Sequence, residues 1–96
     1  MKRNLYYQVR REVVQTYGSE VAFLFAVLEN IGRVWKKDEQ GYFAVWNKYL
    51  VEETGWCTRT IMRKRKVLVK SGLISFKPGK NQNSPCWYRI NTHYQD

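Results

Sequence analysis

The stretch TGWCTRTIMRKRKVLVKSG, residues 54–72, decides the fold of this 96-residue chain. Gly55 and Gly72 suit the ends of helices, and apolar residues recur at helical spacing between them. This pattern predicts a helix inside the stretch. When the helix is wound at about 100° per residue, four basic residues fall within about 60° of one another. These residues, called the basic stripe below, are Arg59, Arg63, Lys66 and Lys70.

The basic stripe has no acidic counterpart nearby. No Asp or Glu occurs between Thr54 and Gln95. A helix face that is merely solvated usually carries charges of both signs, so the interpretation as ordinary surface is the less favoured one. A face of a single positive sign is typical of a surface that binds a polyanion such as nucleic acid.

Another side of the same helix is expected to face a core. Its apolar arc consists of Ile61, Met62, Leu68 and Val69. Arg65 interrupts this arc, and we expect its aliphatic stem to pack over the core while its guanidinium group reaches Glu52 or Glu53. The helix should begin at Cys57 or Thr58.

The flanking segments predict a helix-turn-helix unit followed by a hairpin. A short helix over residues 47–53, capped by Asn47, leads through the glycine turn into the basic helix. Turn residues separate two β-prone runs after Gly72, which predicts a β-hairpin. The two strands and their loop are expected at residues 73–77, 86–91 and 78–85.

The segment of residues 4–17 has apolar residues near helical spacing, with Asn4 as a cap, although residues 5–7 also favour an extended start. Its apolar surface allows a weak homodimer or side-by-side assembly on repeated DNA sites. The alternative is that Tyr6, Val9 and Val13 close the core of the monomer.

A central buried helix is predicted over residues 21–31, with Ser19 as its N-cap and Gly32 as its stop. Residues 42–45 predict a short strand. The expected fold class is therefore α+β, a winged helix-turn-helix of three to four helices with a C-terminal hairpin wing and a short extra strand.

Composition bounds the chain to a single domain over residues 1–96. Its net charge is +9, yet 44% of its residues are hydrophobic, which is ample for a core and argues against disorder. No apolar run approaches the roughly 18 residues of a membrane span, and no signal-peptide pattern follows Met1. A cytoplasmic protein without a membrane partner is expected.

The sequence predicts neither a cofactor nor a metal, and no enzymatic activity. Cys57, Cys86 and His93 cannot supply four zinc ligands at ordinary spacing, and both cysteines are expected to be reduced and structural. A glycine-rich phosphate loop is absent, and the scattered carboxylates form no visible nucleophile and base pair.

The stretches ETGWCTRTI, residues 53–61, and LVKSGLI, residues 68–74, resemble the winged-helix domains of bacterial phage and plasmid replication proteins. The resemblance is to the N-terminal part of DnaD-like replisome organisers and covers roughly residues 5–91. It implies that Gly55 forms the turn, that residues 59–61 start the recognition helix, and that residues 72–74 lead into the wing.

Two features depart from that family. Its members usually have Ser or Thr where Cys57 stands, which would move the cap to Thr58. They also carry a second domain for helicase contact, so helicase loading by this polypeptide alone is not expected.

The stripe and the resemblance together predict a sequence-specific double-stranded DNA-binding protein of a plasmid or phage, acting at an origin of replication or transfer. The alternatives are a winged-helix transcriptional regulator, a winged helix that binds an acidic protein and, less favoured, single-strand binding by the four tryptophans. The expected DNA-binding residues lie on the basic helix and the wing: Thr58, Arg59, Thr60, Arg63, Lys64, Lys66, Lys70, Lys77, Lys80, Asn81, Gln82 and Asn83.

Overall fold

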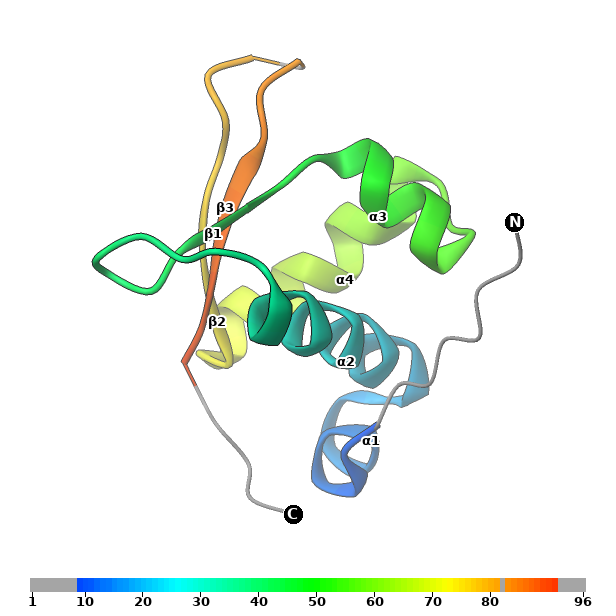
Figure 1. The fold of residues 1–96 in the computed structure, drawn as a ribbon. Coiled ribbons are helices and arrows are strands. Elements are labelled where there is room, and N and C mark those ends of the chain that lie inside the picture. Colours follow the sequence, from blue (N-terminus) through cyan, green and yellow to red (C-terminus); the bar gives the residue numbers. More distant parts are fainter. Residues whose placement is uncertain (1–8, 82, 92–96) are drawn as a thin grey trace.

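The helix predicted from the basic stretch is present as α4 (Thr58–Ser71), and the hairpin follows it directly. The computed structural model describes residues 9–81 and 83–91. In these ranges the chain forms a small α+β domain with four helices and a three-stranded antiparallel sheet (Figure 1). The other elements are α1 (Arg11–Tyr17), α2 (Ser19–Val34), β1 (Phe43–Val45), α3 (Asn47–Thr54), β2 (Ile74–Lys77) and β3 (Cys86–Ile90).

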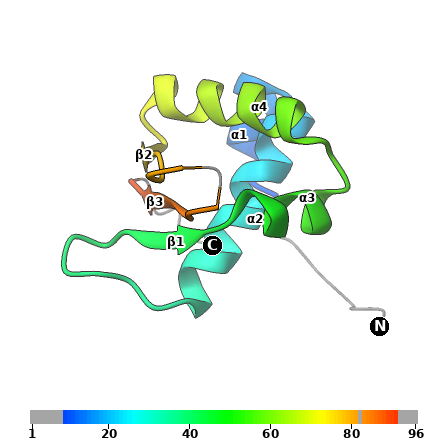
Figure 2. The ribbon, with the colours of Figure 1, turned by 90° about the horizontal axis from the view of Figure 1, so that it is seen from above.

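The sheet has the strand order β1-β3-β2, so the short strand that follows α2 pairs with the far arm of the hairpin. Tyr88 at the centre of β3 is paired with Phe43 on one side and Phe76 on the other. All three residues point toward the helices, because side chains alternate between the two faces of a strand. Seen from above, α4 lies on one side of β2 and β3, and β1 with its preceding loop lies on the other (Figure 2).

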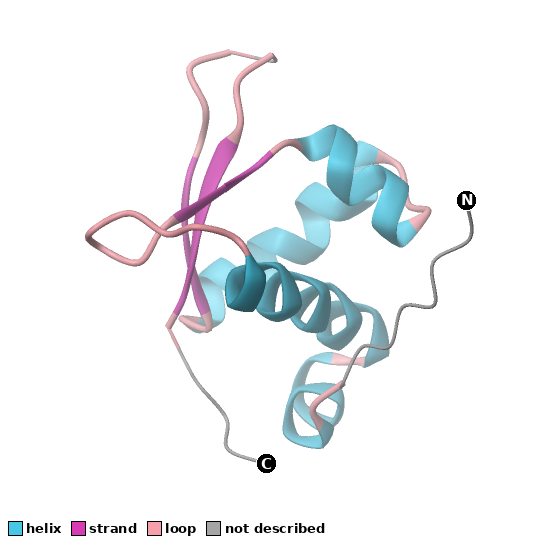
Figure 3. Ribbon diagram, in the orientation of Figure 1, coloured by secondary structure: helices cyan, strands magenta, loops and turns pink. Residues whose placement is uncertain are grey.

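The predicted central helix is confirmed as α2, which packs between the other elements. Leu24, Phe25, Val27 and Leu28 are all fully buried along it. The helices lie together to one side of the sheet, and the hairpin loop extends past them (Figure 3). The hairpin loop and the outer face of α4 are therefore not covered by the core.

Gly32 does not stop α2 as predicted; the helix continues to Val34. A Cβ atom at Gly32 would lie 2.9 Å from Cε1 of Phe43 on β1, so the glycine allows the helix and the sheet to approach closely. The helix start also differs, since Gly18 is the N-cap and Ser19 is already the first helical residue.

Asn47 likewise is the first residue of α3, with Trp46 as the N-cap. The turn after α3 is as predicted. Gly55 ends that helix with a φ of 77°, in the left-handed region that glycine adopts without strain. The chain then enters α4 with Cys57 as the N-cap residue, although no side-chain hydrogen bond caps the helix there.

The segment of residues 4–17 is helical only from Arg11 among its described residues. Val13 is buried in the core, whereas Val9 is exposed. For the described part, the packing of Val13 supports the alternative that this segment closes the monomer core. Asn4 and residues 5–7 lie outside the described residues. Among the helices in the ranges given above, none is long and apolar enough to cross a membrane.

Candidate nucleic-acid interface

The buried face of α4 is a narrow line opposite the basic stripe. Ile61 and Leu68 are fully buried and Arg65 is 8% exposed. At about 100° per residue these three positions are centred roughly 160° from the centre of the stripe. All four stripe residues are exposed. The helix therefore presents its stripe straight to solvent, as the sequence predicts.

The predicted apolar arc is wrong at two of its four positions. Met62 is 50% exposed and Val69 is 39% exposed, so both lie at the surface beside the stripe. The physical reason is the place of Arg65, which forms the edge of the buried face on the side of Met62 and Val69, so that the core contact ends at Arg65 and does not reach these two residues. The result is a mixed surface in which apolar side chains accompany the basic ones.

Arg65 does not pair with Glu52 or Glu53 as expected. Its Nη1 donates hydrogen bonds to the hydroxyl of Tyr88, at 2.9 Å, and to Oδ1 of Asn47, at 3.4 Å. Its guanidinium carbon also lies 4.1 Å from the centre of the Phe76 ring. Burial raises the pKa of Tyr88, which keeps its hydroxyl protonated, while the charge of Arg65 opposes this shift. Arg65 thus ties α4 to α3 and to the sheet.

Lys64, one of the predicted DNA-binding residues, is already engaged within the protein. Its Nζ lies 2.8 Å from Oε1 of Glu20 at the start of α2. The hydrogen bond and charge of Lys64 lower the pKa of the Glu20 carboxyl group. The charge of Lys64 is therefore partly neutralised, in contrast to that of the stripe residues.

The N-terminal turn of α4 carries an exposed thiol. Cys57 Sγ and Thr60 Oγ1 are 3.4 Å apart, and this hydrogen bond lowers the pKa of the thiol. Both cysteines are free. Cys86 is buried, as a structural cysteine should be, but Cys57 is a surface residue. Thr58 is exposed beside it and Thr60 is half-buried.

A groove of about 510 Å³ runs along one flank of α4. Tyr17 and Val21 line one side of it, and Arg63, Lys66 and Lys70 line the other. Tyr17 and Val21 are not among the predicted site residues, because they flank the sharp turn between α1 and α2, and only the packing of α2 on α4 brings them to the stripe.

The hairpin loop, predicted to be a wing, presents three of its predicted contact residues to solvent, namely Lys80, Asn81 and Asn83. The side chain of Asn81 accepts hydrogen bonds from the backbone N–H of Asn83 and from the hydroxyl of Ser84. The side-chain oxygen of Asn81 therefore stabilises the turn. This is a common structural role of Asn in loops and the alternative to a contact with DNA. Gln82 lies outside the described residues.

Lys77 is not brought to the stripe. It lies on the sheet face turned away from the helices, where its Nζ is 4.2 Å from the centre of the Tyr42 ring. The same atom is 3.5 Å from Oε1 of Gln40, to which it donates. Its predicted place among the DNA-binding residues is therefore not supported by its position.

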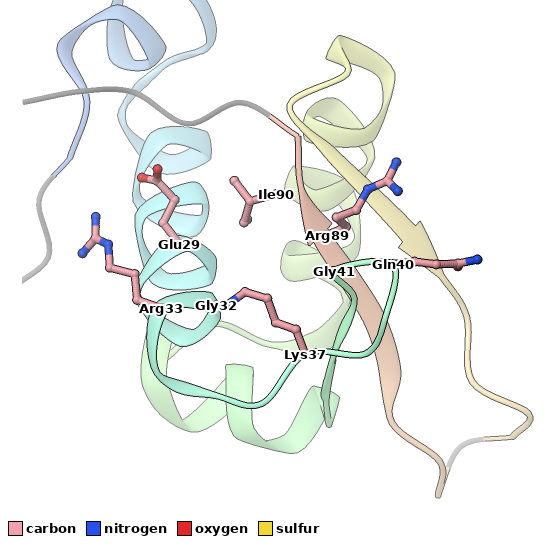
Figure 4. A pocket seen from close by; sticks show the side chains of 8 residues that line it. All are labelled: Glu29, Gly32, Arg33, Lys37, Gln40, Gly41, Arg89 and Ile90. Atoms are coloured by element: carbon pink, nitrogen blue, oxygen red, sulfur yellow. The ribbon is translucent and has the colours of Figure 1, made fainter.

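A cavity of about 340 Å³ lies between α2, the loop before β1, and β3 (Figure 4). Arg33 and Arg89 border it, but their guanidinium groups point away on opposite sides. The carboxylate of Glu29 pairs with Arg10 at 3.4 Å. The amine of Lys37 points into the cavity beside Gly32 (Figure 4), whereas the two arginines point away and the carboxylate is paired, so the polar groups do not converge on one ligand.

Across residues 9–81 and 83–91, no three His, Cys, Asp or Glu side chains gather closely enough to hold a metal ion. The chain matches no protein-family model, no curated protein and no solved structure. The case for a binding site therefore rests on the geometry described above.

Proposed function

We propose that this protein binds double-stranded DNA, with α4 in the major groove and the hairpin loop against the backbone. The element order, in which α3, a glycine turn and α4 are followed by the hairpin, is compatible with a winged helix. An α-helix with its side chains is about 10–12 Å wide and fits a major groove of about 12 Å.

One observation carries the proposal. The four residues of the basic stripe are all exposed, and they lie opposite the buried face of the same helix. Phosphate contacts by Lys and Arg dominate the affinity of proteins for DNA, and a helix that reads bases must present its outer face without obstruction. Both conditions are met by the outer face of α4.

Arginine is suited to the specific part of the recognition. Its planar group can donate two hydrogen bonds to guanine, so Arg59 and Arg63 are the residues that we expect to read bases. Lys66 and Lys70 would hold phosphates, and Lys80 would do so from the wing. The methyl groups of Met62 and Val69 lie beside the stripe and could contact thymine methyl groups.

The wider role belongs to the same proposal. The resemblance of residues 53–61 and 68–74 to phage and plasmid replication proteins supports action at an origin of a mobile element, by a cytoplasmic protein without enzymatic activity. The basic stripe by itself is equally compatible with a transcriptional regulator.

A second candidate is an acidic protein partner. The exposure of Met62 and Val69 next to basic side chains favours it, because an amphipathic acidic helix would match a surface of this kind. Binding of DNA with a strong dependence on salt would distinguish the two functions.

The test compares two single substitutions by fluorescence anisotropy on a labelled duplex. Arg63→Glu should weaken binding by at least about tenfold, since it removes a contact worth about 1–3 kcal/mol and adds a repulsive charge. Arg33→Glu makes the same change at an exposed residue on α2 and should have little effect. Equal losses of duplex affinity in both variants would show that only net charge matters and would contradict the proposal that α4 is the DNA-binding helix.

A further inference from the structure

Three of the four tryptophans line one groove beside the edge strand β1, and one of them, Trp87, lies on the sheet face turned away from the helices. Trp87 projects from β3, Trp46 follows β1, and Trp35 is the C-cap residue that follows α2. Together they line a groove of about 440 Å³. Ala44 pairs directly with Trp87 in the sheet and contributes only a methyl group to the lining, which leaves the space between the rings open.

These rings are more exposed than core packing requires. Trp46 is 49% exposed and Trp87 is 36% exposed. Trp46 is also held in place, since its Nε1 donates a hydrogen bond to the backbone oxygen of Asn83 in the wing loop, at 3.3 Å. The ring of Trp35 rests against Tyr49, with 5.0 Å between the ring centres. The groove thus offers aromatic surfaces whose positions are largely fixed before a ligand arrives.

The rim of the groove is mainly basic. Lys36 and Lys37 line it and are exposed, and Lys37 also borders the adjoining cavity, into which its amine points (Figure 4). The acidic lining residue is Asp38, and its carboxylate already accepts hydrogen bonds from the backbone N–H groups of Gln40 and Tyr42, at 2.8 and 2.9 Å. Aromatic side chains that stack on bases, together with cations that follow the backbone, are the usual means of holding an unpaired strand. A proline-rich peptide also docks on aromatic rings, but it makes no use of the lysines.

We propose that this groove binds an unpaired nucleic-acid strand, with bases stacked on Trp46 and Trp87 and phosphates held by Lys36 and Lys37. The groove lies apart from α4, because β1 and α4 lie on opposite sides of β2 and β3 (Figure 2). The two sites meet at the hairpin loop, where Asn83 accepts the hydrogen bond of Trp46, but no α4 residue lines the groove, so substitutions on α4 test the duplex site alone.

The experiment titrates the full chain with a labelled oligothymidylate, which cannot pair with itself, and follows strand anisotropy and tryptophan fluorescence. Binding should quench the fluorescence. Trp87→Ala should weaken strand binding by about 5- to 150-fold, the loss typical for one stacked base. Trp56→Phe is the matched control, since Trp56 packs against Phe23 at a ring distance of 5.6 Å and does not line the groove. It should bind the strand as the wild type does.

Two further variants test whether Trp87→Ala loses binding only because it unfolds. Ala44→Phe fills the groove while keeping every tryptophan, and it should also weaken strand binding. Replacing both Lys36 and Lys37 with alanine should make the salt slope shallower by about 1.4, since a single strand gives about 0.7 for each phosphate.

The comparison with Arg63→Glu separates this proposal from the duplex site. That variant should lose affinity for duplex and keep its affinity for oligothymidylate. The proposal is overturned if Trp87→Ala binds the strand as tightly as the wild type, or if Arg63→Glu loses strand and duplex binding equally. It is also overturned if the groove variants change only self-association in sedimentation, or if a proline-rich peptide fills the groove and oligothymidylate does not bind.

Discussion

Arg63 and Arg65 are two residues apart on α4 and chemically identical, yet the structure gives them opposite environments. Arg65 is 8% exposed, donates to Tyr88 and Asn47, and stacks on Phe76. Arg63 is exposed and lines the groove beside α4. The side of the helix therefore decides whether an arginine holds the fold or remains available to a ligand. Substitutions at the two positions should separate stability from binding.

The largest effect is expected for Arg65→Ala. It should lower the free energy of unfolding by about 3 kcal/mol, because it leaves the buried hydroxyl of Tyr88 without its donor and removes the contact with Phe76. Urea denaturation measures this change. Arg63→Ala is the matched control and should stay within about 0.5 kcal/mol of the wild type.

Tyr88→Phe offers a milder version of the same test, should Arg65→Ala fail to fold. It removes the hydroxyl alone and should cost about 1 kcal/mol. If Arg65→Ala and Arg63→Ala were equally stable, the contrast between the two faces of α4 would be wrong.

Binding should show the reverse order. Arg63→Ala should cost about 1–3 kcal/mol of affinity for a specific site and relax the preference at one base pair, if its guanidinium group reads guanine. Lys80→Ala in the wing should weaken all sequences alike, because a phosphate contact carries no sequence information. Site selection from a random DNA library with each variant measures both effects. An unchanged set of selected sites for a folded Arg63→Ala would remove Arg63 from base recognition.

A smaller effect is expected from the ion pair between Lys64 and Glu20. Glu20→Gln should release Lys64 for a phosphate, raise duplex affinity by about two- to fivefold and steepen the salt slope by about 0.9. Glu12→Gln, an exposed position on α1, is the control for the change in net charge. Equal gains in both variants would mean that Lys64 contributes no local contact.

Most of the element order could be predicted from local signals. The glycine turn at Gly55, the stop at Gly72 and the two β-prone runs of the hairpin are all confirmed. These features depend on backbone conformation and on spacing along the chain, which a single sequence contains. The stripe depends on helical period in the same way, and the exposure of its residues is confirmed as well.

What could not be predicted depends on contacts between distant residues. Gly32 looks like a helix stop, and only the approach of Phe43 explains why a glycine continues the helix there. The partners of Arg65 come from α3 and β3, and the sequence gives no reason to choose Tyr88 over a nearby glutamate. The tryptophan groove also assembles from the loop after α2, from β1 with the residue that follows it, and from β3, so its tryptophans look like scattered core positions along the chain.

The salt dependence of duplex binding tests the central claim, that the exposed face of α4 is a DNA-binding surface, most directly. If the protein neutralises about five to seven phosphates, the logarithm of the association constant should fall against the logarithm of salt concentration with a slope of about −4.5 to −6. Replacing both Lys66 and Lys70, the phosphate-binding residues of the stripe, with alanine should make that slope shallower by about 2. A slope near zero, or an unchanged slope in the double variant, would contradict the account.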